Sequence, residues 1–279
     1  MDKRGSFVHE IKMENLESLS LFVGTGKCNA SCAHCAGKIH REYAPLEDGV
    51  VDEKLIYKTL KTSYGRGAKS LSISSSGEPT LSPLSITKNF EIINKCKKEG
   101  IDYQKVNLYS NGIIIGKDKP FSDFYLPLWR NYGLKTIYIT MHNADKKKNA
   151  KIYGVKDYPD LRQIVSRIHR ADLKMRANLV LNRETIGTFE EFVSIINSLK
   201  NMGVDSVSAW PIRNAEDKLD CNLSPSEEEI NKMENWVEEN QRDEFRIKLL
   251  RENSRIAYTN KKKLTLFPDG TLSNTWCNH

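Results

Sequence analysis

Short β-rich segments alternate with amphipathic helical patterns along most of the chain, and this alternation limits the fold more than any other feature of the sequence. The β-rich segments are Leu19–Val23, Ser70–Ser74, Val106–Tyr109, Thr136–Thr140, Ala177–Leu181 and Ser206–Trp210. Strands that are separated by helices at this spacing pair in parallel through right-handed crossovers. We therefore predict an α/β fold, a partial (β/α)6 barrel of the TIM-like type.

The helical segments carry their own signals. One of them places four apolar residues on a single helical face. These are Leu161, Ile164, Val165 and Ile168. The next helix opens with Thr188 and Glu191, at the spacing of a capping box, and a second box is predicted at 224–227.

The alternation stops after Trp210. A helical region follows, and then the Asp-Gly pair in Pro268-Asp269-Gly270 separates two short strand-like runs, Leu264–Phe267 and Thr271–Trp276, which is a hairpin signal. We expect two parts, a barrel core over residues 1–213 and a C-terminal helical and β-hairpin extension over residues 214–279 that packs on it.

Composition narrows the functional classes. The 43 Lys and Arg residues exceed the 36 Asp and Glu residues, which gives a formal charge of +7. This excess suits a nucleotide, a nucleic acid or an acidic peptide, although two lysine runs, at 146–148 and 261–263, supply much of it. No apolar run approaches the roughly 18 residues of a membrane span, and the first residues contain no apolar signal core. We therefore expect a cytoplasmic protein with no membrane partner.

Three of the six cysteines lie within eight residues, directly after the first predicted strand. Cys28, Cys32 and Cys35 form a C-x3-C-x2-C pattern. In a parallel barrel the loops that follow the strands carry the chemistry. Three thiolates can hold a four-iron cluster and leave one iron open to a non-protein ligand. Two alternatives stay open at this point, a structural zinc site completed by His34 or His40 and three unrelated buried thiols.

The cysteine pattern resembles the signature of radical S-adenosylmethionine (SAM) enzymes. In that family an aromatic residue beside the SAM adenine usually precedes the third cysteine, and His34 stands at that position here. After the second predicted strand, Ser76-Gly77-Glu78-Pro79 looks like the family's Gly-Gly-Glu-Pro segment, which holds the methionine amino group. Ser76 replaces the first glycine. The resemblance implies cofactor contacts at His34, Gly77 and Glu78.

Further motifs follow the later strands in the family's order. Ser110-Asn111-Gly112 is similar to Thr-Asn-Gly, and Thr140-Met141-His142-Asn143 resembles a strand end whose hydroxyl residue contacts SAM. The resemblance implies SAM contacts at Ser110 and Asn111, and at Thr140 and His142. On the fifth strand, Asn178 binds SAM if its side faces the barrel interior and is solvated if it faces out. The resemblance extends from Ser18 to Arg213 and is closest to the subgroup of molybdopterin-precursor cyclases and peptide-modifying enzymes.

The resemblance implies an enzyme with a [4Fe-4S] cluster, bound by Cys28, Cys32 and Cys35, and SAM. Such an enzyme reductively cleaves SAM to a 5′-deoxyadenosyl radical, which abstracts a hydrogen atom from its substrate. We favour a nucleotide or other small molecule. The alternatives are radical epimerisation or cross-linking of a peptide or nucleic acid, and a non-catalytic metal-binding interaction module. A reducing partner such as a flavodoxin or ferredoxin is implied.

The C-terminal segment from Pro268 to Cys277 resembles the opening of the cluster-binding SPASM domain of peptide-modifying relatives. Outside the triplet only Cys96, Cys221 and Cys277 occur, one fewer than a second cluster held by cysteines alone needs. This truncated pattern makes a peptide substrate less favoured. Cys277 and Cys221 are candidate hydrogen-atom donors, as cysteine thiols are in some members of the superfamily.

Overall fold

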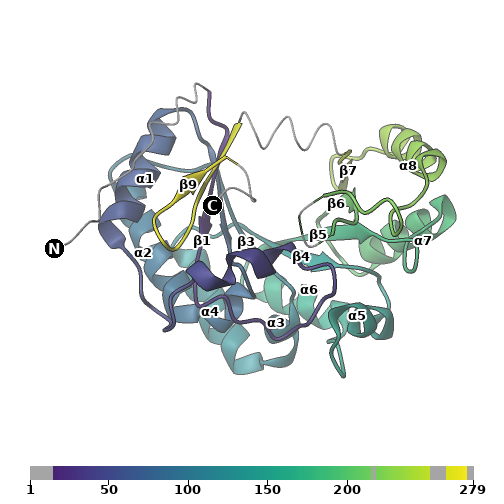
Figure 1. Ribbon diagram of the computed structural model, residues 1–279, viewed down its shortest axis with the longest axis horizontal. Coiled ribbons are helices and arrows are strands. Elements are labelled where there is room, and N and C mark those ends of the chain that lie inside the picture. Colours follow the sequence, from purple (N-terminus) through teal and green to yellow (C-terminus); the bar gives the residue numbers. More distant parts are fainter. Residues whose placement is uncertain (1–14, 215, 217, 252–261, 275–279) are drawn as a thin grey trace.

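A curved, mostly parallel β-sheet forms the centre of the molecule, and helices are arranged around its outside (Figure 1). The computed structural model describes residues 15–214, 216, 218–251 and 262–274. The strands of this part are β1 (Ser18–Phe22), β2 (Ser70–Ser74), β3 (Lys105–Ser110), β4 (Thr136–Met141), β5 (Lys174–Leu181), β6 (Ser206–Pro211), β7 (Arg246–Leu249), β8 (Lys263–Leu266) and β9 (Leu272–Ser273). Their order is β7-β6-β5-β4-β3-β2-β1-β8-β9, and only β9 runs antiparallel to its neighbour. This confirms the predicted α/β fold of partial-barrel type.

The helices follow the strands in the order that the alternation predicts. They are α1 (Glu53–Gly65), α2 (Pro83–Lys98), α3 (Ile113–Lys117), α4 (Lys119–Asn131), α5 (Lys146–Tyr153), α6 (Leu161–Arg170), α7 (Phe189–Asn201) and α8 (Glu227–Glu239), with 3₁₀ turns η1 (Ala36–Tyr43) and η2 (Pro79–Leu81). The apolar face predicted for α6 is buried. The capping box at Thr188 and Glu191 is confirmed. The second predicted box, at 224–227, is wrong: Ser226, not Ser224, caps α8 by accepting from the Glu229 amide, and the Ser224 hydroxyl donates to the Ile212 carbonyl.

The two faces of the sheet differ in chemistry. Leu71 and Ile73 of β2 point to the helix side and are fully buried in the hydrophobic core. Ser20 and Ser72 point to the other side, where their hydroxyls lie 2.6 Å apart. Alternation along each strand therefore gives an apolar outer face, which the helices cover, and a polar inner face.

The C-terminal region adds strands to both edges of the sheet. The prediction that the alternation stops after Trp210 is wrong, because α8 and β7 continue it and β7 pairs with β6 in parallel. At the other edge, β8 pairs with β1 in parallel. The predicted hairpin is present between β8 and β9, with Gly270 at a φ of 90°, a conformation that favours glycine. The division of the chain at residue 213 stays a prediction. No helix in the described ranges has the length and apolar character that crossing a membrane requires.

An aromatic cluster ties β8 to the region after the cysteines. The His40 ring, in η1, packs against Phe22 at the end of β1 and Phe267 just after β8, with ring centroids 5.8 and 4.9 Å away. His40 is only 2% exposed. The C-terminal hairpin and the cysteine region are thus packed as one unit.

Candidate active site

The cysteine loop begins at the carboxyl end of β1. Cys28, Cys32 and Cys35 are all half-buried free thiols. Burial raises the pKa of Cys28, and burial together with the charges of Cys35 and Cys28 raises the pKa of Cys32 to about 12. The three thiols therefore lie close enough to influence one another. Their thiolate forms need a positive charge between them, which is what an iron centre provides.

The loop after β2 packs against the cysteine loop, backbone on backbone. The Glu78 amide donates to the Lys27 carbonyl at 2.9 Å. A Cβ added at Gly77 would lie 2.1 Å from that carbonyl oxygen and 2.3 Å from that of Gly26, so only glycine fits there. Ser76, the departure from the family pattern, does not have the positive φ that would demand glycine.

The Glu78 carboxylate joins the loops after β2 and β3. Its Oε1 accepts from the Ser110 hydroxyl at 2.7 Å, and from the hydroxyl and the backbone amide of Thr80 at 2.6 and 3.1 Å. Its Oε2 accepts from the backbone amide of Asn111 at 2.7 Å. Burial raises the pKa of the Glu78 carboxyl, and these hydrogen bonds oppose that shift. The carboxylate predicted to touch the cofactor is thus occupied by groups of the protein itself.

Asn111 connects the loop after β3 to the cysteine loop. Its side-chain amide donates to Asn29 Oδ1 at 2.7 Å, and its Oδ1 accepts from the Ile113 amide. The end of α5 holds the same loop, because the Ser31 amide donates to the Tyr153 carbonyl at 2.8 Å. Asn29 and Ser31 were missed at the sequence level. Their position between the cysteines is the only sequence signal for them.

A ring cluster lies where β4 ends. The His142 ring packs edge-to-face against His34 and Tyr153, with centroids 4.9 and 5.1 Å away. His142 is 1% exposed, and neither ring nitrogen has a hydrogen-bond partner in the described part of the chain. Burial, with a contribution from His34, lowers the pKa of His142 to about 3. The structure therefore brings the predicted residues His34 and His142 together, with His142 as a neutral ring.

Three inner-face polar residues form a row across β4, β5 and β6. Asn178 pairs with Thr140 on one side and Ser208 on the other. Asn178 faces the interior and is 1% exposed, and both atoms of its side-chain amide lack a partner among the described residues. Ser208 was not predicted as a site residue. Strand alternation from Asn178 and the register of β6 would have pointed to it.

Of the two candidate hydrogen donors, the structure describes Cys221. Cys221 is exposed, in the turn between β6 and α8. Cys277 lies outside the described residues.

Comparison with known families decides what this arrangement belongs to. The sequence model of the radical SAM superfamily matches residues 22–209. The chain belongs to the radical SAM superfamily. Membership makes it a radical SAM enzyme with a [4Fe-4S] cluster and SAM as cofactors, and confirms the resemblance drawn from the motifs.

Several known proteins resemble this chain at a distance. GTP 3′,8-cyclase of Campylobacter jejuni (strain RM1221) is 28% identical over 180 residues, which are 63% of this chain and 50% of that protein. The chain thus spans about half the length of the curated relatives it matches. Streptococcus suis SuiB has a TM-score of 0.65 at 14% identity over 94% of this chain and 60% of that one. Methylornithine synthase (PylB) has a TM-score of 0.55 at 12% identity over 92% and 74%. The two structures establish the shared fold.

The residues at the carboxyl ends of the strands fit the two radical SAM cofactors. The three half-buried thiols on one loop match the donor set of a cluster that leaves one iron open, although among the described residues no three His, Cys, Asp or Glu side chains are grouped as a bound metal ion requires. The unpartnered amide of Asn178 and the unpartnered ring nitrogens of His142 are buried groups that a polar ligand would satisfy. The backbone of the Gly77 loop lies directly against the cysteine loop.

Proposed function

We propose that this radical SAM enzyme removes a hydrogen atom from a small molecule, with a nucleotide as the first candidate, bound on the inner face of the sheet beside SAM. The observation that carries the proposal is the buried, unpartnered amide of Asn178 in a row with Thr140 and Ser208, which marks where SAM and the substrate beside it would lie. An amide buried without a partner costs about 1–3 kcal/mol. A polar ligand on the inner face removes that cost. The relative with GTP in its name supports a nucleotide.

Cys28, Cys32 and Cys35 would hold the cluster. When bound, the cluster and SAM supply the one-electron reduction and the carbon-centred radical that removes hydrogen from the substrate. The loops after β2 and β3 and the end of α5 would hold the cysteine loop, and with it the cluster, in place.

The SAM contacts divide into two kinds. His34, the Gly77 backbone, Thr140, His142 and Asn178 would touch SAM directly. A second group, Glu78, Ser110 and Asn111, acts as positioning residues, because their side chains already bind one another and the cysteine loop.

Cys221 and Cys277 remain proposed hydrogen-atom donors to the substrate radical. If either acts so, its replacement by Ala would stop product formation while SAM is still cleaved. A cysteine whose Ala variant still cleaves SAM and still forms product is not the donor.

The test is release of 5′-deoxyadenosine from SAM by anaerobically reconstituted protein reduced with dithionite or flavodoxin. Parallel assays contain buffer, a small-metabolite extract or a macromolecular extract. We expect release that rises with the small-metabolite extract and is abolished by Cys28→Ala, Cys32→Ala and Cys35→Ala. Cys96→Ala is the matched control, since Cys96 lies on the buried face of α2 and its replacement should leave the iron content unchanged.

Stimulation by the macromolecular extract alone would overturn the small-molecule proposal in favour of a peptide or nucleic acid. No release from protein that carries full iron and sulfide would favour a barrel that binds SAM without cleaving it. A colourless, zinc-loaded protein would favour the non-catalytic module.

A further inference from the structure

The strands carry a one-sided charge. None of the described strands contains Asp or Glu, and their Lys and Arg residues all fall on the inner face by register and alternation. These residues are Lys105, Lys174, Arg176, Arg246, Lys248 and Lys263. Four of them lie at or near the amino ends of β3, β5 and β7. The inner face is therefore cationic at the end of the sheet opposite the cysteine loop.

An open pocket of about 1160 Å³ lies at this end of β3–β7, and Lys105, Lys174, Arg176 and Arg246 line it. We call it the amino-end pocket. Seven Lys and Arg side chains line it against four Asp and Glu side chains. The pocket thus has an excess of three positive charges before any ligand binds.

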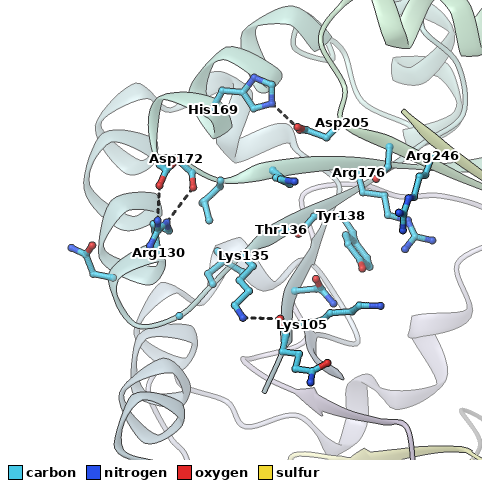
Figure 2. A pocket seen from close by; sticks show the side chains of 18 of the residues that line it. Lys105, Arg130, Lys135, Thr136, Tyr138, His169, Asp172, Arg176, Asp205 and Arg246 are labelled. Carbon is cyan, nitrogen blue, oxygen red and sulfur yellow. Dashed lines mark hydrogen bonds and ion pairs between the residues drawn. The ribbon is translucent and has the colours of Figure 1, made fainter. Parts of the chain in front are cut away.

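Most of the pocket's carboxylates are already engaged at its rim. Asp172 pairs with Arg130, and Asp205 pairs with His169 at 2.8 Å, as Figure 2 shows. Asp243, whose side chain is 99% exposed, lies 3.7 Å from Arg246, and Glu244 is the fourth. Among the described residues no carboxylate pairs with Lys105, Lys174 or Arg176. These three charges are left for a ligand.

Arg176 is held in a fixed position between the amino-end pocket and the row of Thr140, Asn178 and Ser208. Its guanidinium lies over the Tyr138 ring at 4.7 Å and donates to the hydroxyl of Ser208, which pairs with Asn178. Tyr138 is in turn packed edge-to-face on Tyr109 at 5.0 Å. In Figure 2 the Arg176 and Arg246 side chains both reach into the space beside the Tyr138 ring. A guanidinium ordered in this way loses little freedom when it binds an anion.

We propose that the amino-end pocket binds phosphate groups of the substrate, through Arg176 and Arg246 with Lys105 and Lys174. This inference rests on the proposed function. The cations lie on β3, β5 and β7. Each of these strands is two strand spacings, or about 10 Å, from the next of the three, so one carboxylate cannot reach all the cations. Arg176 and Asn178 are two residues apart on one face, about 7 Å along the strand. A small molecule with phosphates at one end can thus place a carbon atom beside Asn178, where SAM would bind.

The test is direct binding of inorganic pyrophosphate and tripolyphosphate to the reconstituted, SAM-loaded protein, by isothermal titration calorimetry at two salt concentrations. We expect saturable binding that weakens with salt. Arg176→Gln and Arg246→Gln should each weaken it about tenfold or more, as loss of one charge-assisted hydrogen bond predicts. Arg176→Lys, which keeps the charge and the fold, should retain part of the affinity. Lys61→Gln, on the exposed side of α1, is the matched control.

Circular dichroism and the release of 5′-deoxyadenosine without substrate are measured on the same samples of the wild-type protein. No saturable phosphate binding, or equal weakening in Lys61→Gln, overturns the pocket assignment. Equal binding of citrate at matched charge overturns the preference for phosphate. If a ten-nucleotide RNA binds more tightly than the phosphates, and Arg176→Gln abolishes that binding, the small-molecule substrate is overturned in favour of a nucleic acid. Phosphate binding that persists in a protein unable to cleave SAM would instead refute the proposed function and leave the pocket in place.

Discussion

The Ser110 hydroxyl, at the end of β3, donates a 2.7 Å hydrogen bond to Glu78 Oε1, in the loop after β2. The same carboxylate accepts the Asn111 amide through Oε2. Two neighbouring strand ends are therefore fastened to one buried acid. Its pKa is raised by burial, and the hydrogen bonds work in the opposite direction.

Replacing Glu78 by Gln tests which of these opposing effects is larger. The Gln amide nitrogen would face the Asn111 amide, donor against donor, so we expect a loss of about 1–3 kcal/mol in the free energy of unfolding. Urea unfolding of the cluster-free protein measures it, with Glu91→Gln on the exposed side of α2 as the control. An E78Q protein as stable as the wild type would mean that desolvation of the carboxylate outweighs its hydrogen bonds.

Gly77→Ala should separate the loop after β2 from the cysteine loop. The new methyl group would meet the Lys27 and Gly26 carbonyls, which belong to the backbone and cannot move aside alone. We expect lower iron and sulfide content after reconstitution and a loss of about 1–3 kcal/mol in stability. Gly65→Ala is the matched control, because its Cβ would meet nothing within 4 Å and helix α1 should gain up to about 1 kcal/mol. Full cluster content in Gly77→Ala would show that the two loops are not packed as described.

Asn178→Ala should weaken SAM binding without a matching loss of stability. The removed amide has no partner in the described structure, so its loss relieves a desolvation cost that offsets the small cavity left behind. We expect the Kd for SAM to rise about tenfold, measured by equilibrium dialysis, and the free energy of unfolding to change by less than about 1 kcal/mol. Asn89→Ala should lower the stability and leave the Kd for SAM unchanged, since the Asn89 side-chain amide donates to the Ser85 carbonyl within α2. Unchanged SAM affinity in N178A would remove Asn178 from the site.

The stability of the cluster-free protein should fall in mild acid because of His142. Its pKa is about 3 in the folded protein and about 6.5 when unfolded, so the unfolded state takes up the proton first. The stability from this residue is present above pH 6.5 and is lost as the pH falls from 6.5 toward 3. Between pH 6.5 and 5 the loss is about 1.5–2 kcal/mol.

His142→Phe should remove that part of the pH dependence while keeping a ring against His34 and Tyr153. Urea unfolding at several pH values measures the difference from the wild type. Tyr153→Phe alters the same ring cluster without removing a group that titrates in acid, and should keep the wild-type slope. A His142→Phe protein with the wild-type slope would mean that His142 is protonated in the fold.

The sequence patterns predicted the regular part of the fold because helical and strand periodicity are local properties. They did not predict that β8 pairs with β1, since that contact joins short segments some 245 residues apart and no local signal encodes it. The motif at Glu78 was found from its spacing. Its partners Ser110 and Asn111 follow another strand, so its role in joining the loops is visible only in three dimensions.

Asn178 shows what the sequence could not determine about the orientation of a site residue. Alternation left two orientations open for this residue, and only the curvature and pairing of the sheet place it inward and bury it. Asn29 was missed for a different reason. Its partner Asn111 lies 82 residues away, and an asparagine next to a cysteine carries no signal of its own.

The pairing of β8 with β1 has a consequence for how the protein is made. Phe267, just after β8, supports His40 behind the cysteine loop, yet it is synthesised more than 230 residues after Cys28. At roughly 5–20 residues per second on the ribosome, that interval is on the order of ten seconds or more. The cysteines therefore leave the ribosome well before Phe267 can pack on His40, and the aromatic support of η1 is completed only when β8 has paired with β1.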